Sequence, residues 1–245
     1  PDPVGRATML KHPLRDSFMA GEVDEWETLL RDGHMHIRDA REKPRGTHVG
    51  RAHWVYKQRL GDGVQPACGR SRLVYDPAGC TDYGGLPVTS PASAWHASCA
   101  LFALKTQHKW HMRGCDVKKA YLNGKLPEGK GYWARLPKGY EDGNEGKLLY
   151  FSSGIYGAGP SGRTWYETNN QALIDYGCIP MKCEPTVWVR RDARGLLICA
   201  FNTDDGIILS DDPAIADEFT AYYNGTFDVR WGNITRFGGV NVSVD

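Results

Sequence analysis

Apolar and polar residues follow two different periods along this chain, and these periods predict both helices and strands. Residues Leu196–Ser210 contain two short apolar runs on either side of the polar sequence Asn202–Gly206. Apolar runs of about five residues that end at turn-forming residues indicate buried strands. We therefore expect a strand–turn–strand hairpin here, with the adjacent carboxylates of Asp204 and Asp205 at its tip.

The helical period predicts four helices, at residues 21–31, 93–108, 163–176 and 213–223. In the second of them, Trp95, Cys99 and Phe102 recur at i, i+4 and i+7, which predicts that they form the buried face. Ser90 or Ser93 is the candidate N-cap of this helix.

Further strands are predicted where short runs are bounded by Gly, Pro, Asn or Asp, at residues 34–37, 52–60, 70–75, 111–117, 132–136, 147–151, 186–190 and 237–242. Gly177 is expected to end the third helix, and Pro213 to lie in the first turn of the fourth. Helices mixed with antiparallel hairpins, without an internal repeat, are typical of an α+β fold.

Composition agrees with a globular chain of one large domain or two packed subdomains. The 245 residues are 41% hydrophobic and include 8 Trp, of which we expect Trp54, Trp165 and Trp188 in the core. The 7 cysteines form no C-x₂-C pair, which favours reduced thiols in an intracellular protein of the cytoplasm, nucleus or an organelle. Neither a signal peptide nor a long apolar run is present, so we expect no membrane insertion. A start at Pro1 suggests a processed product or a fragment.

Charge is distributed unevenly, although the net charge is only +1. Residues 31–72 carry ten Lys and Arg against four acids, whereas residues 201–229 carry seven acids and no Lys or Arg. A basic and an acidic segment together are what a site for a polyanion and a divalent metal needs. The alternative is that the basic segment is an ordinary solvated face.

The pair Asp204-Asp205 has two interpretations. Adjacent carboxylates repel each other, and a bound Mg²⁺ is one way to compensate that repulsion. An Asp-Asp-Gly sequence is also an ordinary solvated turn. Asp116, near the end of a predicted strand, adds a third carboxylate, which is the minimum for two divalent metal ions.

Residues Cys115–Gly124 read CDVKKAYLNG, and this sequence resembles the D-V-K-T-A-F-L-N-G signature of copia-type LTR-retrotransposon reverse transcriptases. The similarity continues in order through blocks that resemble the family's K-W-V-Y-K, K-A-R-L-V, F-S-P-V, Y-M-E-Q-P-P-G-F-E, L-Y-G-L-K-Q-A-P-R-A-W-Y-E, D-P-S-L-F, Y-V-D-D and F-L-G-I-E-I. These blocks lie at His53–Lys57, Arg70–Val74, Ser90–Pro91, Tyr132–Glu141, Ile155–Glu167, Glu184–Trp188, Asn202–Asp205 and Phe237–Val242.

The resemblance implies a right-hand polymerase reduced to fingers and palm, in which the palm is a split βαβ antiparallel sheet with helices on one face. Residues 1–20 would form an N-terminal arm. The fingers would span residues 21–92 and 132–162, and the palm residues 93–131 and 163–245. A thumb, an RNase H domain and an integrase lie outside the resemblance.

The resemblance also implies the site. Asp116, Asp204 and Asp205 would be the catalytic metal ligands for two Mg²⁺ or Mn²⁺ ions, with an RNA template and a DNA primer as partners. The nucleotide-binding residues would be Arg72, Tyr121 and Val117, with Tyr121 excluding a ribose 2′-OH.

Departures from the family pattern keep two hypotheses open. Asn202 replaces the Tyr of Y-V-D-D, Asp76 replaces a basic residue, and residues 159–162 read Gly-Pro-Ser-Gly where the family has Lys-Gln-Ala-Pro. Losing one donor of this kind costs about 10²–10³ in rate. The chain is therefore either a weakened RNA-directed DNA polymerase or an inactive, domesticated pseudoenzyme that serves as a structural or RNA- or protein-binding subunit of a larger complex.

Overall fold

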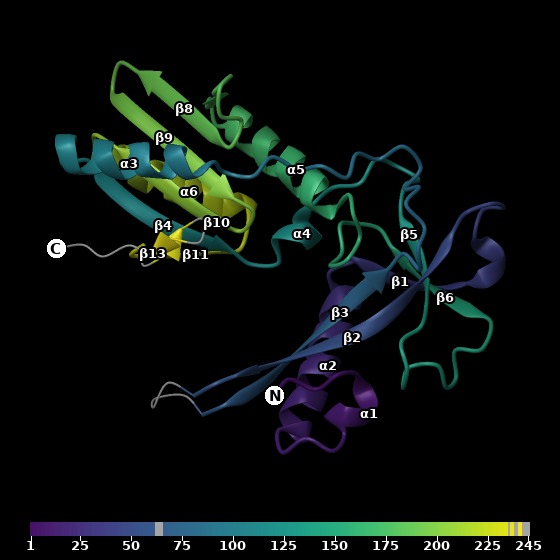
Figure 1. The fold of residues 1–245 in the computed structure, drawn as a ribbon. Coiled ribbons are helices and arrows are strands. Elements are labelled where there is room, and N and C mark those ends of the chain that lie inside the picture. Colours follow the sequence, from purple (N-terminus) through teal and green to yellow (C-terminus); the bar gives the residue numbers. More distant parts are fainter. Residues whose placement is uncertain (62–65, 235, 238–239, 242–245) are drawn as a thin grey trace. The chain divides into compact units, whose positions relative to one another are not determined.

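The chain forms two compact units in the computed structural model, which describes residues 1–61, 66–234, 236–237 and 240–241. The first unit contains Pro1–Val88 and Lys125–Ser161, and the second contains Thr89–Gly124 and Gly162–Asp245. Figure 1 labels their helices and strands. The fold is α+β, as predicted.

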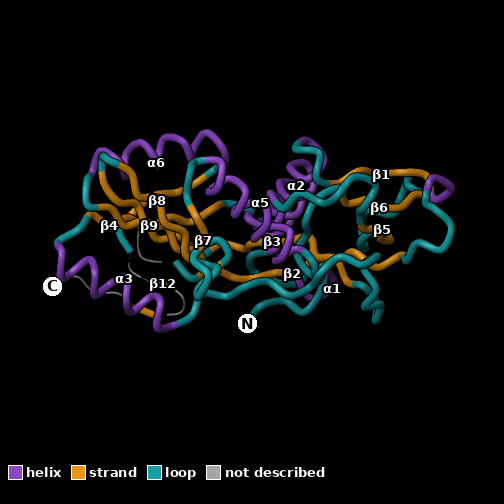
Figure 2. Tube along the Cα trace, turned by 90° about the horizontal axis from the view of Figure 1, so that it is seen from above, coloured by secondary structure: helices purple, strands orange, loops and turns teal. Residues whose placement is uncertain are grey.

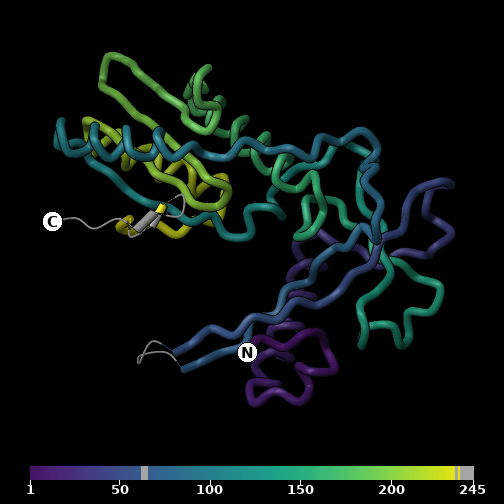
Figure 3. Tube along the Cα trace, in the orientation of Figure 1, coloured from purple at the N-terminus to yellow at the C-terminus, as the bar shows by residue number. Residues whose placement is uncertain are grey.

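The first unit is built on a five-stranded sheet in the order β1-β6-β5-β2-β3. The β2–β5 pair is parallel and the other pairs are antiparallel. Figure 3 shows how the later segment of this unit returns to the strands of the first segment. Its elements are α1 (Arg6–Met9), α2 (Arg15–Arg31), β1 (Met35–Asp39), the 3₁₀ turn η1 (Ala40–Glu42), β2 (Val49–Arg59), β3 (Cys68–Asp76), β5 (Tyr132–Arg135) and β6 (Lys147–Phe151).

Helix α2 covers one face of the β2–β3 ribbon. Strand β2 alternates strictly, with Trp54 and Tyr56 buried and their neighbours exposed. Phe18 of α2 contacts Tyr56 edge-on at 5.5 Å between ring centroids, and its carbonyl accepts a 2.7 Å hydrogen bond from Ser71 Oγ. This contact explains why α2 begins at Arg15, six residues before the predicted start.

The second unit is built on a six-stranded antiparallel sheet in the order β11-β4-β10-β9-β8-β7. The predicted hairpin is present as β9–β10. The elements are α3 (Trp95–His108), β4 (His111–Val117), α4 (Ala120–Asn123), α5 (Ser161–Asp175), β7 (Ile179–Pro180), β8 (Val187–Asp192), β9 (Gly195–Asn202), β10 (Asp205–Ser210), α6 (Pro213–Thr226), β11 (Val229–Gly232), β12 (Arg236–Phe237) and β13 (Val240–Asn241).

Helices cover both faces of this sheet, so the prediction of helices on one face is wrong. Cys199 of β9 packs with α5 and α6, whereas its neighbour Ala200 packs in a second cluster with Leu101 of α3 and Phe237 of β12. Figure 2 shows α6 and α3 on opposite sides of strands β8 and β9. A strand that is apolar at successive positions has two faces to bury, and each face needs its own cover.

The local signals at the ends of α5 and α6 are confirmed. Gly177 has φ 93° and donates to the carbonyl of Ile174, while the next N–H reaches the carbonyl of Leu173, which together form a Schellman motif. Asp212 caps α6 through a 2.8 Å hydrogen bond from Ala214 N–H, and Pro213 takes the first helical position.

The predicted cap of α3 is wrong, and of its predicted buried face only Phe102 is confirmed, since it is half-buried against the cluster that contains Leu101. Trp95 is 60% exposed and Cys99 is exposed, whereas Ser98 and Leu101 are buried on the sheet. The N-cap is Ala94, without a side-chain hydrogen bond, and Ser90 donates instead to the carbonyl of residue 162 at 3.1 Å. The apolar residues of α3 are spread around the helix, so the sequence allows more than one buried face. Contact with the sheet determines which face is buried.

The remaining predictions concern burial and the C-terminal strand. Trp54, Trp165 and Trp188 are buried, as predicted. The strand predicted at 237–242 falls on β12 and β13, and residues 238–239 and 242 of it lie outside the described residues. All seven cysteines, which lie in the described ranges, are free thiols. In the part of the chain that the structure describes, no helix is long and apolar enough to span a membrane.

Candidate active site

Strands β4 and β10 bring two of the predicted carboxylates together. Asp116 and Asp205 are direct partners in this antiparallel pair. Direct partners lie on the same face with their Cβ atoms about 4.5–5.5 Å apart. Cys115 and Val117, on either side of Asp116 along β4, pack in the cluster of α5 and α6. Because side chains alternate between the faces of a strand, the two carboxylates lie on the opposite face of the sheet.

Two hydrogen bonds hold the tip of the β9–β10 hairpin. Thr203 and Asp204 form the turn between the paired residues Asn202 and Asp205. Thr203 has φ 59°, a conformation that β-branched residues rarely adopt. Its carbonyl accepts a 2.7 Å hydrogen bond from Trp165 Nε1, and the carbonyl of Asp204 accepts a 2.8 Å hydrogen bond from the N–H at the end of β4. Helix α5 and strand β4 thus fix the tip.

The carboxylates present suit a divalent metal that is completed by other ligands. Within the described ranges, no group of three or more His, Cys, Asp or Glu residues is close enough to hold an ion, so Asp204 does not complete a trio with Asp116 and Asp205. Mg²⁺ is commonly held by one or two carboxylates, with substrate phosphates and water as the other ligands. The donor chemistry of the Asp116–Asp205 pair therefore fits Mg²⁺ or Mn²⁺.

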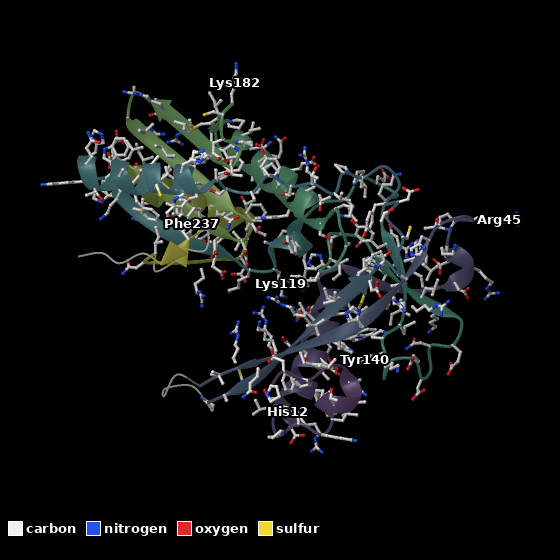
Figure 4. All side chains as sticks on the ribbon, viewed as in Figure 1. His12, Arg45, Lys119, Tyr140, Lys182 and Phe237 are labelled. Atoms are coloured by element: carbon white, nitrogen blue, oxygen red, sulfur yellow. The ribbon has the colours of Figure 1, made fainter. Side chains whose placement is uncertain are left out.

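A hollow of about 210 Å³ lies beside the acid pair. Its lining comes from β4, β10, β11 and the segment after β11, and includes Asp116, Asp205, Arg230, Trp231 and Phe237. Phe237 is labelled in Figure 4. The hollow can hold several water molecules next to the carboxylates.

The residues behind the acid pair are closely packed. A Cβ at Gly206 would collide with the ring of Phe201 and lie 2.5 Å from Cys115 Sγ. Burial, with the nearby charges of Asp205 and Asp116, raises the pKa of Cys115 to about 12, so that this residue remains a neutral thiol. Glycine is therefore required immediately after Asp205, and the Cys115 thiol lies on the face of the sheet opposite the acid pair.

Arg72 lies on the outward face of the β2–β3 ribbon in the first unit. Its guanidinium lies 4.8 Å from the ring centre of Tyr156, and its Nε is buried without a hydrogen-bond partner among the described residues. Lys57 and Arg70 are direct partners on the same face. Like charges in such a pair are destabilising, which is expected of a surface that binds an anion.

The acid that departs from the family pattern is neutralised locally. Arg51 donates from Nε and Nη2 to Asp76 Oδ2 at 3.0 and 2.7 Å. Together with a hydrogen bond from the N–H of Ala78, this contact lowers the pKa of Asp76. Asp76 therefore adds little negative charge to the basic face of the ribbon.

The other two predicted nucleotide-binding residues belong to the second unit. Val117 is buried at the end of β4, and its N–H makes the hydrogen bond to the hairpin tip. Tyr121 lies in α4 and packs, half-buried, against the cluster of α5 and α6. Lys119, labelled in Figure 4, connects these two elements with φ 53°.

Sequence reasoning missed three residues of this site. Trp165 and Thr203 were not expected to share a hydrogen bond, and Arg230 was not expected beside Asp116. The only signal for the first was the W-Y-E block, which places an indole-bearing residue on α5 without naming its partner. Nothing local in the sequence gives the register of β11 against β4.

A comparison with protein-family models matches residues 37–245 to the family described as reverse transcriptase (RNA-dependent DNA polymerase). The match covers most of the chain and includes β4, the β9–β10 hairpin and the acid pair. The predicted resemblance is thus confirmed. The chain belongs to the reverse transcriptase family and is a reverse transcriptase domain of the copia type.

Proposed function

We propose that this domain is a weakened RNA-directed DNA polymerase that transfers nucleotides at the Asp116–Asp205 pair. The observation that carries the proposal is the direct pairing of these acids, from β4 and β10, beside a hollow and a clamped hairpin tip. Bound Mg²⁺ or Mn²⁺ would stabilise negative charge on the attacking and leaving oxygens. Asp116 and Asp205 would hold the ion, and Asp204 at the exposed tip is proposed as a further ligand when substrate is bound.

The two units would have different roles in nucleotide transfer. We assign the first unit to the fingers and the second to the palm of a right-hand polymerase. Arg72, with a buried Nε that lacks a partner among the described residues, would bind the triphosphate of the incoming nucleotide. Tyr121 would lie against the ribose. An RNA template and a DNA primer would be the partners.

The weakness of the enzyme follows from missing donors. Residues 159–162 carry no Lys or Gln, and Asn202 supplies no aromatic surface beside the acid pair. Nucleotidyl transfer depends on positioning and on stabilising phosphate charge, so each missing donor lowers the rate by about 10²–10³.

Primer extension on an RNA template, with Mg²⁺ or Mn²⁺, tests the proposal. Asp116→Asn and Asp205→Asn should each abolish extension. Asp24→Asn, an exposed acid of α2, should leave extension unchanged. No extension by the unaltered protein at high metal and nucleotide concentrations, or equal extension by the acid variants, would refute it.

The alternative is an inactive scaffold within a larger protein assembly. Asp76 favours it, because this acid is paired with Arg51 and occupies a position where the family has a basic residue. Residues 159–162 favour it too, because they lack the Lys and Gln side chains of the family. This function predicts that the protein purifies with other subunits. A monodisperse monomer in size-exclusion chromatography with light scattering would count against it.

A further inference from the structure

A row of polar residues crosses four strands of the second unit at the acid pair. Arg230 of β11 is the direct partner of Asp116, Asp116 is the partner of Asp205, and Asp205 is the partner of Asn202. Because direct antiparallel partners share a face, all four side chains lie on the face that carries the acid pair. Arg230 is the basic member of this row.

The backbone of Arg230 is held firmly. The next residue, Trp231, packs on the opposite face against Phe219 and donates from Nε1 to Asn224 Oδ1 at 2.8 Å. One residue before β11, the carbonyl of Asp228 accepts a 2.9 Å hydrogen bond from the N–H of Lys118. These contacts set the register of β11 and place Arg230 opposite Asp116.

The side chain of Arg230 is held loosely. Its Nη2 lies 4.0 Å from Asp116 Oδ2, at the outer limit of an ion pair, and the side chain is 77% exposed. Exposed pairs of this kind contribute little to stability, so the guanidinium can leave Asp116 at small cost. It also lines the hollow beside the acid pair, where a phosphate could reach it.

We propose that Arg230 couples metal binding to phosphate binding at the acid pair. This inference rests on the proposed function. In the metal-free protein the guanidinium of Arg230 lies beside Asp116 and competes with a divalent cation for its carboxylate. With a divalent cation held by Asp116 and Asp205, the guanidinium of Arg230 would leave Asp116 and bind a backbone phosphate of the primer–template.

The physical basis is competition for one carboxylate. A divalent ion and a guanidinium on Asp116 repel each other, and the ion attracts the carboxylate more strongly. The planar guanidinium matches a phosphate through two parallel hydrogen bonds. Without a cation, the negative charges of Asp116 and Asp205 would repel a phosphate. Arg230 therefore opposes metal binding when nucleic acid is absent, and supports nucleic-acid binding when the metal is present.

Opposite shifts in two affinities test the proposal. Mn²⁺ binding to the full chain is measured by calorimetry without nucleic acid. Binding of a labelled DNA primer annealed to an RNA template is measured by fluorescence anisotropy with Mn²⁺ saturating. Arg230→Ala should tighten Mn²⁺ binding about threefold to tenfold and weaken primer–template binding by a similar factor, since an exposed pair is modest in strength.

Two controls separate position from charge. Arg230→Lys should restore the wild-type Mn²⁺ affinity, because it keeps the charge, but should bind the primer–template more weakly than the wild type, because it lacks the bidentate fork. Arg194→Ala removes the same charge just before β9, at the end of that strand away from the acid pair. Arg194 pairs with Asp192 and Glu218, so its replacement should change neither affinity.

The outcomes are distinct. If Arg230→Ala weakens both affinities, or changes neither, while the wild type binds Mn²⁺, the coupling proposal is overturned and the proposed function stands. If the wild type binds no Mn²⁺ without nucleic acid, Arg230 has no cation to compete with and this inference is overturned, whereas the proposed function is decided separately by primer extension.

Discussion

Replacing Trp165 with Phe tests whether the hairpin tip is held in place for metal binding. Trp165 is 2% exposed, packs edge-on against Phe227 at 5.1 Å, and donates to the carbonyl of Thr203 at 2.7 Å. Trp165→Phe keeps an aromatic ring in the core but removes this hydrogen bond. The backbone of Thr203, at positive φ, then loses one of the contacts that stabilise the turn.

The magnitude follows from the atoms removed. A phenyl ring has two fewer ring carbons than an indole, which costs about 1.6 kcal/mol of buried apolar contact at about 0.8 kcal/mol per carbon. The hydrogen bond adds about 1 kcal/mol. We expect the free energy of unfolding to fall by about 3 kcal/mol. If about 1 kcal/mol of that loss acts on the tip, the Kd for Mn²⁺ rises about fivefold.

Trp188→Phe is the matched control. Trp188 is fully buried in the same cluster and donates from Nε1 to Asn170 Oδ1 at 2.8 Å, so its replacement removes the same atoms and one hydrogen bond. Neither Trp188 nor Asn170 contributes a hydrogen bond to the turn. Stability is measured by urea denaturation followed by circular dichroism, and Mn²⁺ affinity by calorimetry.

The two variants should lose similar stability, and only Trp165→Phe should lose Mn²⁺ affinity. Equal weakening of Mn²⁺ binding in both would show that general destabilisation, not the tip, is responsible. Unchanged Mn²⁺ binding in Trp165→Phe would show that the hydrogen bond to Thr203 does not position the acids.

Three further predictions concern packing and charge elsewhere. Gly206→Ala should lower the free energy of unfolding by about 1–3 kcal/mol and weaken Mn²⁺ binding, because its Cβ has no space, whereas Gly225→Ala in α6 meets open space and should not destabilise in the same urea denaturation. Glu22→Ala should lower the free energy of unfolding by about 3 kcal/mol, because it leaves both the guanidinium of Arg6, 3.2 Å from Glu22, and the buried hydroxyl of Tyr56 without their partner; an unchanged urea midpoint would contradict this. Burial raises the pKa of Tyr75 to about 12, above its unfolded value of about 10, so this residue contributes stability below pH 10 that is lost between about pH 10 and 12, at about 1.4 kcal/mol per pH unit. Alkaline denaturation followed by circular dichroism should therefore be less steep in Tyr75→Phe, and an identical slope would refute the assignment.

Signals that act over a few residues were readable in the sequence. The β9–β10 hairpin follows from two apolar runs around Asn202–Gly206, and the end of α5 follows from Gly177. The buried Trp residues follow from their size, and the family follows from ordered sequence blocks. Periodicity, caps and turn chemistry depend on neighbours along the chain, so no tertiary information is needed to read them.

The tertiary structure decided which face of each element is used. The apolar residues of α3 allow more than one buried stripe, and packing on the sheet selected Ser98 and Leu101 over Trp95. A continuous apolar strand such as β9 does not indicate whether one or both faces of its sheet are covered. In this structure both faces are buried under other elements. These outcomes depend on what lies opposite, which residues distant in sequence supply.

The sequence by itself determined the chemical types at the site and the local shape of its hairpin. Only the tertiary structure paired Asp116 with Asp205, placed Arg230 opposite Asp116, and joined Trp165 to Thr203. Strand register between segments about ninety residues apart is set by packing of the whole sheet, and a shift of one residue would turn the acids to the other face. The sequence therefore shows which residue types the site contains, and the fold decides which of them lie together.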